Sequence, residues 1–133
     1  MIITYLWIAI GSALGGAARF GFTLWAARAW GETFPWGTLL INILGSFVIG
    51  LFFNLTMADG PLPASANVRL FVMSGLCGGF TTFSAFSLQT LTLMQNGEWF
   101  DAASNVALSV VLCMVAVWVG HLAAASLNQL RGA

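Results

Sequence analysis

Residues 75–89 read GLCGGFTTFSAFSLQ. The stretch lies within an apolar segment of membrane-spanning length, yet it places three glycines in five positions and follows them with two adjacent threonines. Glycine costs a helix about 1 kcal/mol relative to alanine, and threonine is restricted at χ1. Backbone that leaves a helix inside hydrocarbon must line a cavity or be buried in protein. The stretch therefore predicts an interrupted helix near the bilayer midplane, where broken helices tend to hold ions.

The composition is that of an integral membrane protein. The chain has 133 residues, of which 59% are hydrophobic and 6% are charged, whereas a soluble domain carries about 25% charged residues. Its net charge of zero provides no basic patch for nucleic acid. Cys77 and Cys113 have neither partner spacing nor a nearby histidine pair, so we expect free buried thiols.

Four apolar segments predict a single all-α domain of four membrane-spanning helices. Each approaches or exceeds the roughly 20 residues that a helix needs to cross a bilayer. In the first, Gly11 and Gly15 lie four residues apart, a spacing that lets helix backbones approach closely. The predicted spans are residues 2–25, 36–57, 68–95 and 101–127.

Two polar residues within the first two spans each allow two interpretations. Arg19 could extend its charge to the membrane surface, or it could add positive potential to an aqueous vestibule. Asn42 could join neighbouring helices by hydrogen bonds, or it could donate to an ion in a pore.

The arginines are divided almost evenly between the two sides of a four-span topology. Arg69 and Arg131 fall on the side of both termini, and Arg28 falls on the other side with Arg19 nearest to it. The positive-inside rule then gives almost no bias in orientation. Insertion in both orientations would allow an antiparallel homodimer, and a weakly biased single orientation is the alternative.

The spans contain hydrogen-bond donors but no interior carboxylate. Every Asp and Glu falls in a loop or at a span end, which weakens proton-coupled transport and leaves no acid–base pair for an enzyme. Phe83 and Phe86 are three residues apart and share a helical face, and their ring edges carry partial positive charge. Donors and ring edges suit a small anion, although phenylalanines at this spacing are ordinarily packing residues. The neutral donors are Asn42, Ser84, Ser87, Asn105 and Ser109.

Three motifs resemble the signatures of the Fluc (CrcB) fluoride channels. They are GGAARF at residues 15–20, GTLLINILGSF at residues 37–47 and GGFTTFSAFS at residues 78–87. The resemblance implies a channel that lets fluoride leave the cytoplasm passively across the bacterial inner membrane. It also implies a dual-topology antiparallel homodimer in membrane lipid, with two pores and a structural sodium ion at the dimer centre.

The resemblance also assigns roles to individual residues. The sodium ligands would be the backbone carbonyls of Gly78 and Thr81, so that bulk at Gly78 would distort the site. The pore would be lined by Phe83, Phe86, Asn42 and the hydroxyl of Ser109, with Arg19 in a vestibule. This chain departs from the common family pattern at Gln89, Asn105 and Cys113, where many members have glutamate, tyrosine and serine.

Two other functions compete with the channel. A dual-topology small multidrug transporter also has four short spans, but it needs an acidic residue in its first span, and residues 2–25 contain none. A scaffold subunit without transport leaves the glycine–threonine stretch and Asn42 unexplained.

Overall fold

The architecture is all-helical. The structure, a computed structural model, describes residues 1–132, with side chains through residue 130. Four helical segments are long and apolar enough to cross a membrane, which confirms the predicted class. The first, second and fourth segments are single helices: α1 (Ile2–Trp30), α2 (Trp36–Leu55) and α6 (Trp99–Gly132). The third segment is composed of α3 (Ala66–Leu70), η1 (Phe71–Cys77), α4 (Gly78–Phe80) and α5 (Phe83–Gln95).

The helix ends follow local backbone chemistry. The first helix continues past residue 25 to Trp30 and ends at Gly31, whose φ of 79° is in the left-handed region that glycine adopts readily. Gly97 has the same φ in the turn between α5 and α6. Ser65 caps α3 by accepting a hydrogen bond from the Val68 N–H.

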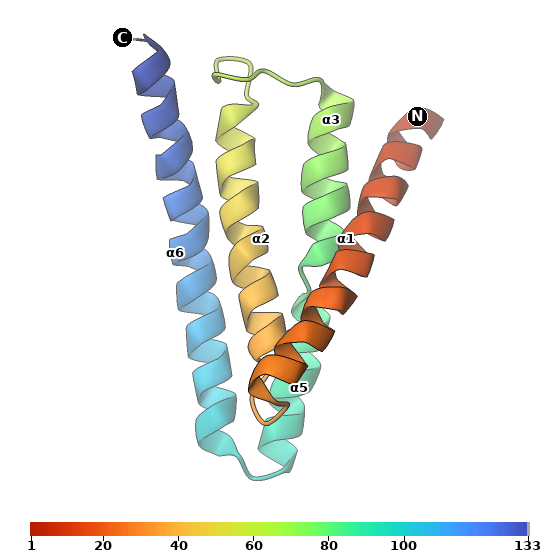
Figure 1. Ribbon diagram of the computed structural model, residues 1–133, viewed down its shortest axis with the longest axis vertical. Helices are drawn as coiled ribbons and strands as arrows, with labels where there is room; N and C mark the ends of the chain where they lie inside the picture. Colours follow the sequence, from red (N-terminus) through yellow and green to blue (C-terminus); the bar gives the residue numbers. More distant parts are fainter. Residues whose placement is uncertain (133) are drawn as a thin grey trace.

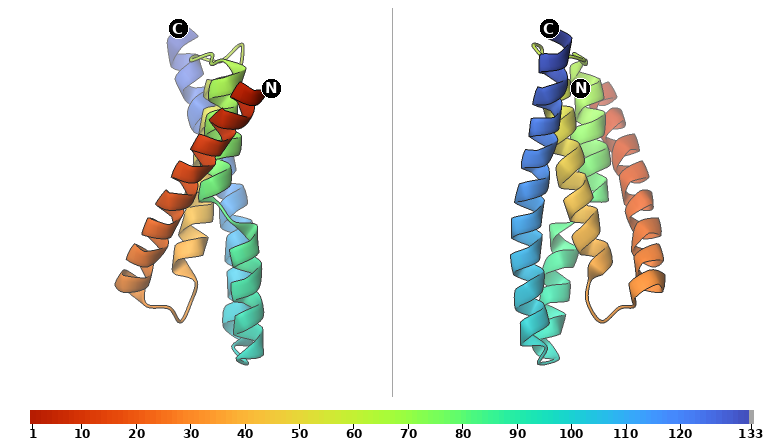
Figure 2. Two further views of the ribbon diagram at one scale, coloured as in Figure 1. Left: turned by 90° about the vertical axis from the view of Figure 1, so that its right-hand side faces the viewer. Right: turned by 60° about the vertical axis from the view of Figure 1, so that its left-hand side comes forward.

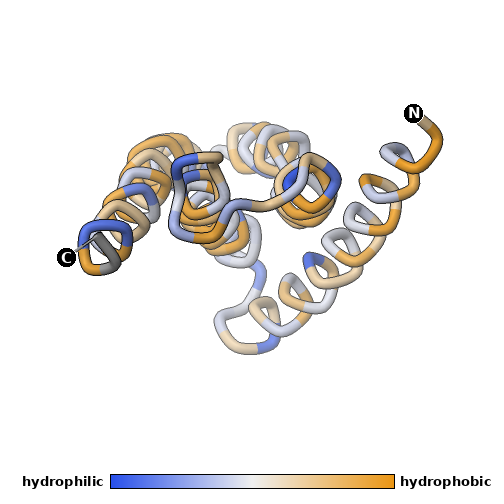
Figure 3. Tube along the Cα trace, turned by 90° about the horizontal axis from the view of Figure 1, so that it is seen from above, coloured by the Kyte–Doolittle hydropathy of each residue, from blue (hydrophilic) through white to orange (hydrophobic). Residues whose placement is uncertain are grey.

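The four segments form a splayed bundle (Figure 1). Both termini and the loop that follows α2 lie at one end, and the loops between α1 and α2 and between α5 and α6 lie at the other. The α2 helix packs along α6, while α1 crosses η1 and α4 at a slant (Figure 2). Seen from above, the amino-terminal end of α1 stands apart from the other helices (Figure 3).

Small residues allow the two main helix contacts. A Cβ on Gly11 would lie 2.5 Å from the Phe71 carbonyl oxygen, and one on Gly75 would lie 3.0 Å from the Cα of Gly11. Gly50 and Gly120 bring α2 and α6 together in the same way, since a Cβ on either would collide with the backbone of the other helix. Because lipid is as apolar as the helix surfaces, the hydrophobic effect does not drive these helices together, and close van der Waals packing of their backbones does so instead.

Most large apolar side chains point outward. Leu39, Ile41 and Leu93 are among the few large apolar side chains that are buried, whereas Trp118 and Phe100 are 63% and 83% exposed. An apolar exterior of this extent fits lipid or another apolar helix surface. The fold thus leaves its outer faces for membrane contact or assembly.

Candidate ion-conducting site

The third segment leaves the helical conformation at two threonines. The α4 helix ends at Phe80 and α5 begins at Phe83, and the residues between them, Thr81 and Thr82, have extended backbones with ψ of 159° and 118°. Thr82 caps α5, because its hydroxyl accepts a hydrogen bond from the Ala85 N–H at 3.2 Å.

The glycines themselves are helical, which corrects the glycine part of the reason given for the interruption and leaves the threonine part standing. Gly75 lies in η1, and Gly78 and Gly79 lie in α4. Gly75 and Gly79 serve instead as contact points for α1, and a Cβ on Gly79 would lie 2.5 Å from the carbonyl oxygen of Ser12. The glycines therefore permit close approach, and the extended residues are the threonines.

Asn42 holds the extended backbone with both ends of its amide. Its Nδ2 donates to the Thr82 carbonyl at 3.0 Å, and its Oδ1 accepts from the Thr82 N–H at 2.8 Å. These bonds replace helical ones, so the backbone polar groups of Thr82 are satisfied within the span. Asn42 is thus an inter-helix anchor; it also lines the adjoining cavity, and its Nδ2 carries a second hydrogen beyond the one bonded to Thr82.

Arg19 extends to the same interruption. Its Nη1 donates to the Thr81 carbonyl oxygen at 3.3 Å, although the two residues come from different spans. The guanidinium is therefore directed at the carboxyl end of α4, where the carbonyl groups of a helix carry partial negative charge. This contact draws the positive charge toward the interruption, which disfavours simple extension to the membrane surface.

A cavity of about 430 Å³ opens beside the interruption. It brings together residues of α2, the third segment and α6 that are far apart in the sequence. Six predicted site residues line it: Asn42, Gly78, Thr81, Phe83, Phe86 and Ser109.

The two phenylalanines form a pair at the wall of this cavity. Their ring centroids are 5.1 Å apart and their planes are inclined by 49°. Phe86 is 8% exposed, whereas Phe83 is 77% exposed. The Phe86 ring is therefore held by packing within the chain, whereas the Phe83 ring is accessible to lipid or to another helix on this face.

The other predicted donors lie outside the cavity wall. Asn105 is 1% exposed and donates to the Thr90 hydroxyl at 2.9 Å, which in turn donates to the Phe86 carbonyl at 2.8 Å. The Ser109 hydroxyl lies 3.5 Å from the Asn105 Oδ1, at the limit of a hydrogen bond. Asn105 thus ties α6 to the backbone of Phe86.

The two serines of α5 are exposed. The Ser87 hydroxyl donates to the Phe83 carbonyl of its own helix at 2.9 Å, and the Ser84 hydroxyl lies 3.2 Å from that of Thr82. Neither serine lines the cavity within one chain, although each bonds to a residue that does. Thr82 and Thr90 take part in the polar network but were not among the predicted site residues, although Thr90 continues the face of Phe83 and Phe86 by four positions.

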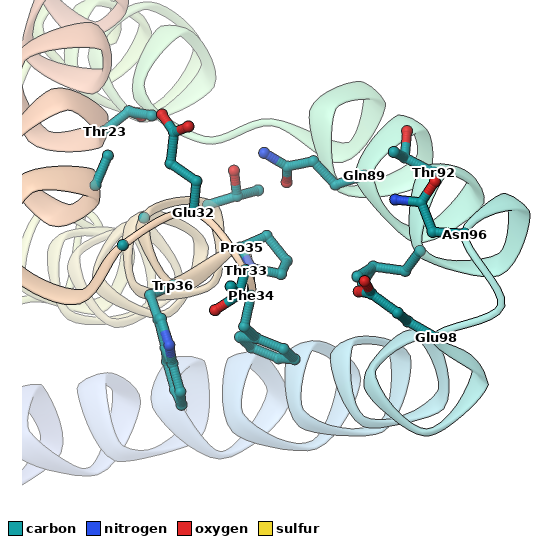
Figure 4. Close-up of a pocket in the computed structure, with 15 residues that line it drawn as sticks. Thr23, Glu32, Thr33, Phe34, Pro35, Trp36, Gln89, Thr92, Asn96 and Glu98 are labelled. Carbon is teal, nitrogen blue, oxygen red and sulfur yellow. The ribbon is translucent and has the colours of Figure 1, made fainter.

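A second cavity of about 330 Å³ forms a polar vestibule where the α1–α2 loop faces the end of α5 (Figure 4). Gln89 extends from α5 toward the loop that carries Glu32, and its Oε1 is buried without a hydrogen-bond partner among the described residues. Thr38 lines the vestibule and Asn42, one turn further along α2, lines the cavity. One turn of α2 therefore lies between the two hollows, which share no lining residue, and Arg19, predicted to lie in a vestibule, lines neither.

Within residues 1–132 no cluster of three or more His, Cys, Asp or Glu side chains could hold a metal. Cys77 and Cys113 carry free thiols, but only Cys77 is buried as predicted, whereas Cys113 is half-buried. A cation at the interruption would instead have main-chain ligands. The Thr82 N–H, which a continuous helix would direct at the Gly78 carbonyl, is bonded to Asn42. The Gly78 carbonyl is therefore released from that helical bond.

Comparison with known proteins gives one family throughout. The model of the family described as "CrcB-like protein, Camphor Resistance (CrcB)" matches residues 6–121. A protein of Methylocella silvestris named fluoride-specific ion channel FluC is 61% identical over 97% of this chain and 98% of its own length. Proteins of the same name from Opitutus terrae and Paramagnetospirillum magneticum are 56% and 52% identical, over 96% of this chain and over 97% and 100% of their own lengths. The chain belongs to the CrcB family.

Proposed function

We propose that this protein is a fluoride-specific channel of the bacterial plasma membrane, through which fluoride leaves the cytoplasm passively. The observation that carries the proposal is the cavity beside the interruption, where Asn42, Phe83, Phe86 and Ser109 converge from three spans. Amide and hydroxyl hydrogens and the edges of aromatic rings all present positive charge. They can replace part of the water shell of a small anion, which is how ion filters select.

The experiment is anion efflux from liposomes that contain the purified protein. Fluoride should leave rapidly and chloride should not, and protein-free liposomes give the background. Phe83→Ile and Phe86→Ile keep apolar bulk but remove the ring edge, so each should lower fluoride efflux. Equal efflux of fluoride and chloride would refute fluoride selectivity.

The multidrug transporter is not favoured. Its first-span acid is absent from α1, and relatives that cover nearly the whole chain are named as fluoride channels. An ion channel is not an enzyme.

We further propose that two copies assemble as an antiparallel homodimer. Phe83, Ser84, Ser87 and Leu88 form an exposed face on α5 directly beside the cavity. A second copy on this face would cover Phe83 and bring both serines close to the anion path. Gly16 and Gly21 have no atom near a built Cβ within one chain and could admit a helix of the partner or lipid.

A sodium ion would fit the interruption as a structural cofactor of this dimer. Its ligands would be the carbonyl oxygens of Gly78 and Thr81, since neutral main-chain oxygens suit a hard monovalent cation. The Thr81 oxygen already accepts from Arg19 but has a second lone pair. Sodium bound there would supply positive charge and hold the two interruptions together.

Exchange of sodium for a large organic cation, with time for release, tests this role. Fluoride efflux and the dimer fraction should both fall, and both should return when sodium is restored. If fluoride efflux and the dimer fraction both persist in full, sodium has no structural role in this protein.

A further inference from the structure

The end of the molecule opposite the vestibule has its own hollow, of about 590 Å³, between the α2–α3 loop and η1. Arg69 and Ser74 line it. The Arg69 guanidinium lies 5.2 Å from the ring centroid of Phe53, which holds the charge at this position by a cation–π contact. A fixed cation raises the local concentration of anions. This hollow is therefore suited to be an anion entrance.

One side chain is shared by the lining of this hollow and that of the cavity of Asn42, Phe83 and Phe86. Met73 lines both, and the two hollows have no other lining residue in common. A third hollow, of about 640 Å³, shares Ile49, Met73 and Met114 with the cavity but only Met73 with the Arg69 hollow, so Met73 is the one residue common to both sides. It is half-buried and belongs to the π-helical segment η1. Segments of π-helix occur often at functional sites, and methionine is apolar and flexible about three bonds.

We propose that Met73 is the apolar constriction between the Arg69 hollow and the anion cavity, and that it sets the rate of fluoride conduction. The inference rests on the proposed channel function. An anion that passes an apolar narrowing loses water contacts there, and hydrophobic constrictions in channels control conduction by dewetting. A smaller side chain at position 73 should then raise the rate of conduction, and a larger one should lower it. Substitution of a residue that only packs would instead lower the stability of the protein.

The test measures fluoride efflux from liposomes for a series at this position. Met73→Ala widens the constriction and should raise efflux by about threefold, and Met73→Trp should lower it by about tenfold or more. Met73→Leu, of similar volume, should stay near the unmodified rate. Met57→Ala is the matched control, because Met57 is exposed beyond the end of α2 and lines neither hollow.

The thermal midpoint of each purified variant is measured beside efflux. Higher efflux for Met73→Ala with lower efflux for Met73→Trp supports the constriction. If the unmodified protein conducts fluoride and both variants match it, the constriction is refuted while the channel function stands. Loss of efflux in step with loss of stability in Met73→Ala would make Met73 a packing residue and also refute the proposal. An unmodified protein that carries no fluoride would refute the channel function itself.

Discussion

Asn42 shows how one side chain can make irregular backbone tolerable within a span. Its amide satisfies both the N–H and the carbonyl of Thr82, at 2.8 and 3.0 Å. A buried polar group left without a partner costs about 1–3 kcal/mol. The extended conformation of Thr82 therefore depends on a residue that is 40 positions away in the chain.

We predict that Asn42→Leu, which keeps the volume, lowers the thermal midpoint and abolishes fluoride efflux. Asn54→Leu is the matched control on the same helix, because the Asn54 Nδ2 donates only to the Gly50 carbonyl one turn before it. Loss of the Asn54 amide therefore leaves no polar group of another helix without its hydrogen-bond partner. The role of Asn42 as an anchor is wrong if the two variants have equal thermal midpoints.

Residue types were easier to predict than residue partners. The sequence singled out Asn42, Phe83, Phe86 and Ser109, and the structure places all four on one cavity. The network of Asn105 with Thr90 was not predictable, because a hydrogen bond between two spans depends on how α5 and α6 rotate against each other. Local sequence patterns do not predict how two helices are rotated relative to each other.

At the scale of elements, the third segment combines a contact surface and an interruption. Its glycines at positions 75 and 79 meet α1, and its extended residues follow immediately. Low helix propensity pointed to the threonines, which leave the helix, but also to the glycines, which remain helical. Glycine loses its disadvantage when a neighbouring backbone needs the space, and that need is visible only in the packing.

Two adjacent glycines differ in what surrounds them: Gly79 packs against α1 within the chain, whereas Gly78 has open space beside it. A Cβ on Gly79 would lie 2.8 Å from the Cα of Ser12, whereas a Cβ on Gly78 would meet only the Met73 carbonyl, at 3.8 Å. A Cβ on Gly78 therefore has room within one chain, and the expectation that bulk at Gly78 distorts the sodium site stays a prediction about the dimer. We predict that Gly79→Ala lowers the thermal midpoint of the chain and that Gly78→Ala leaves it unchanged.

Circular dichroism and size-exclusion chromatography measure the two effects. Gly78→Val, which adds more bulk at the exposed site, should reduce the dimer fraction and fluoride efflux while the helical content is retained. Loss of helical content in Gly78→Ala, or a Gly79→Ala protein as stable as the unmodified one, would contradict the assignment.

At the scale of the whole molecule, hydropathy was sufficient to predict the four spans. The helices are long and apolar, and their outer faces stay exposed. The chain lacks a strong charge bias, because Arg69 lies in α3 and Arg28 in the last turn of α1, and these helix segments lie at opposite ends of the bundle (Figure 1). Weak bias permits insertion in both orientations.

We predict that a short run of lysines added to the carboxyl terminus biases insertion and lowers the yield of dimer. Co-expression with a chain biased the other way should restore it. Accessibility of a terminal tag from each side of the membrane measures orientation directly. Tags found on one side only in the unmodified protein would exclude the antiparallel dimer.

We propose that fluoride passes through the cavity beside Thr81 and Thr82. The most direct measurement is fluoride efflux from liposomes, followed with a fluoride electrode, for the unmodified protein and for Phe86→Ile, with chloride efflux as the reference. We predict rapid fluoride efflux, slow chloride efflux, and a marked loss of fluoride efflux in the variant while the dimer remains intact. Fluoride efflux that equals the protein-free background, or that is the same in the variant, would contradict the claim.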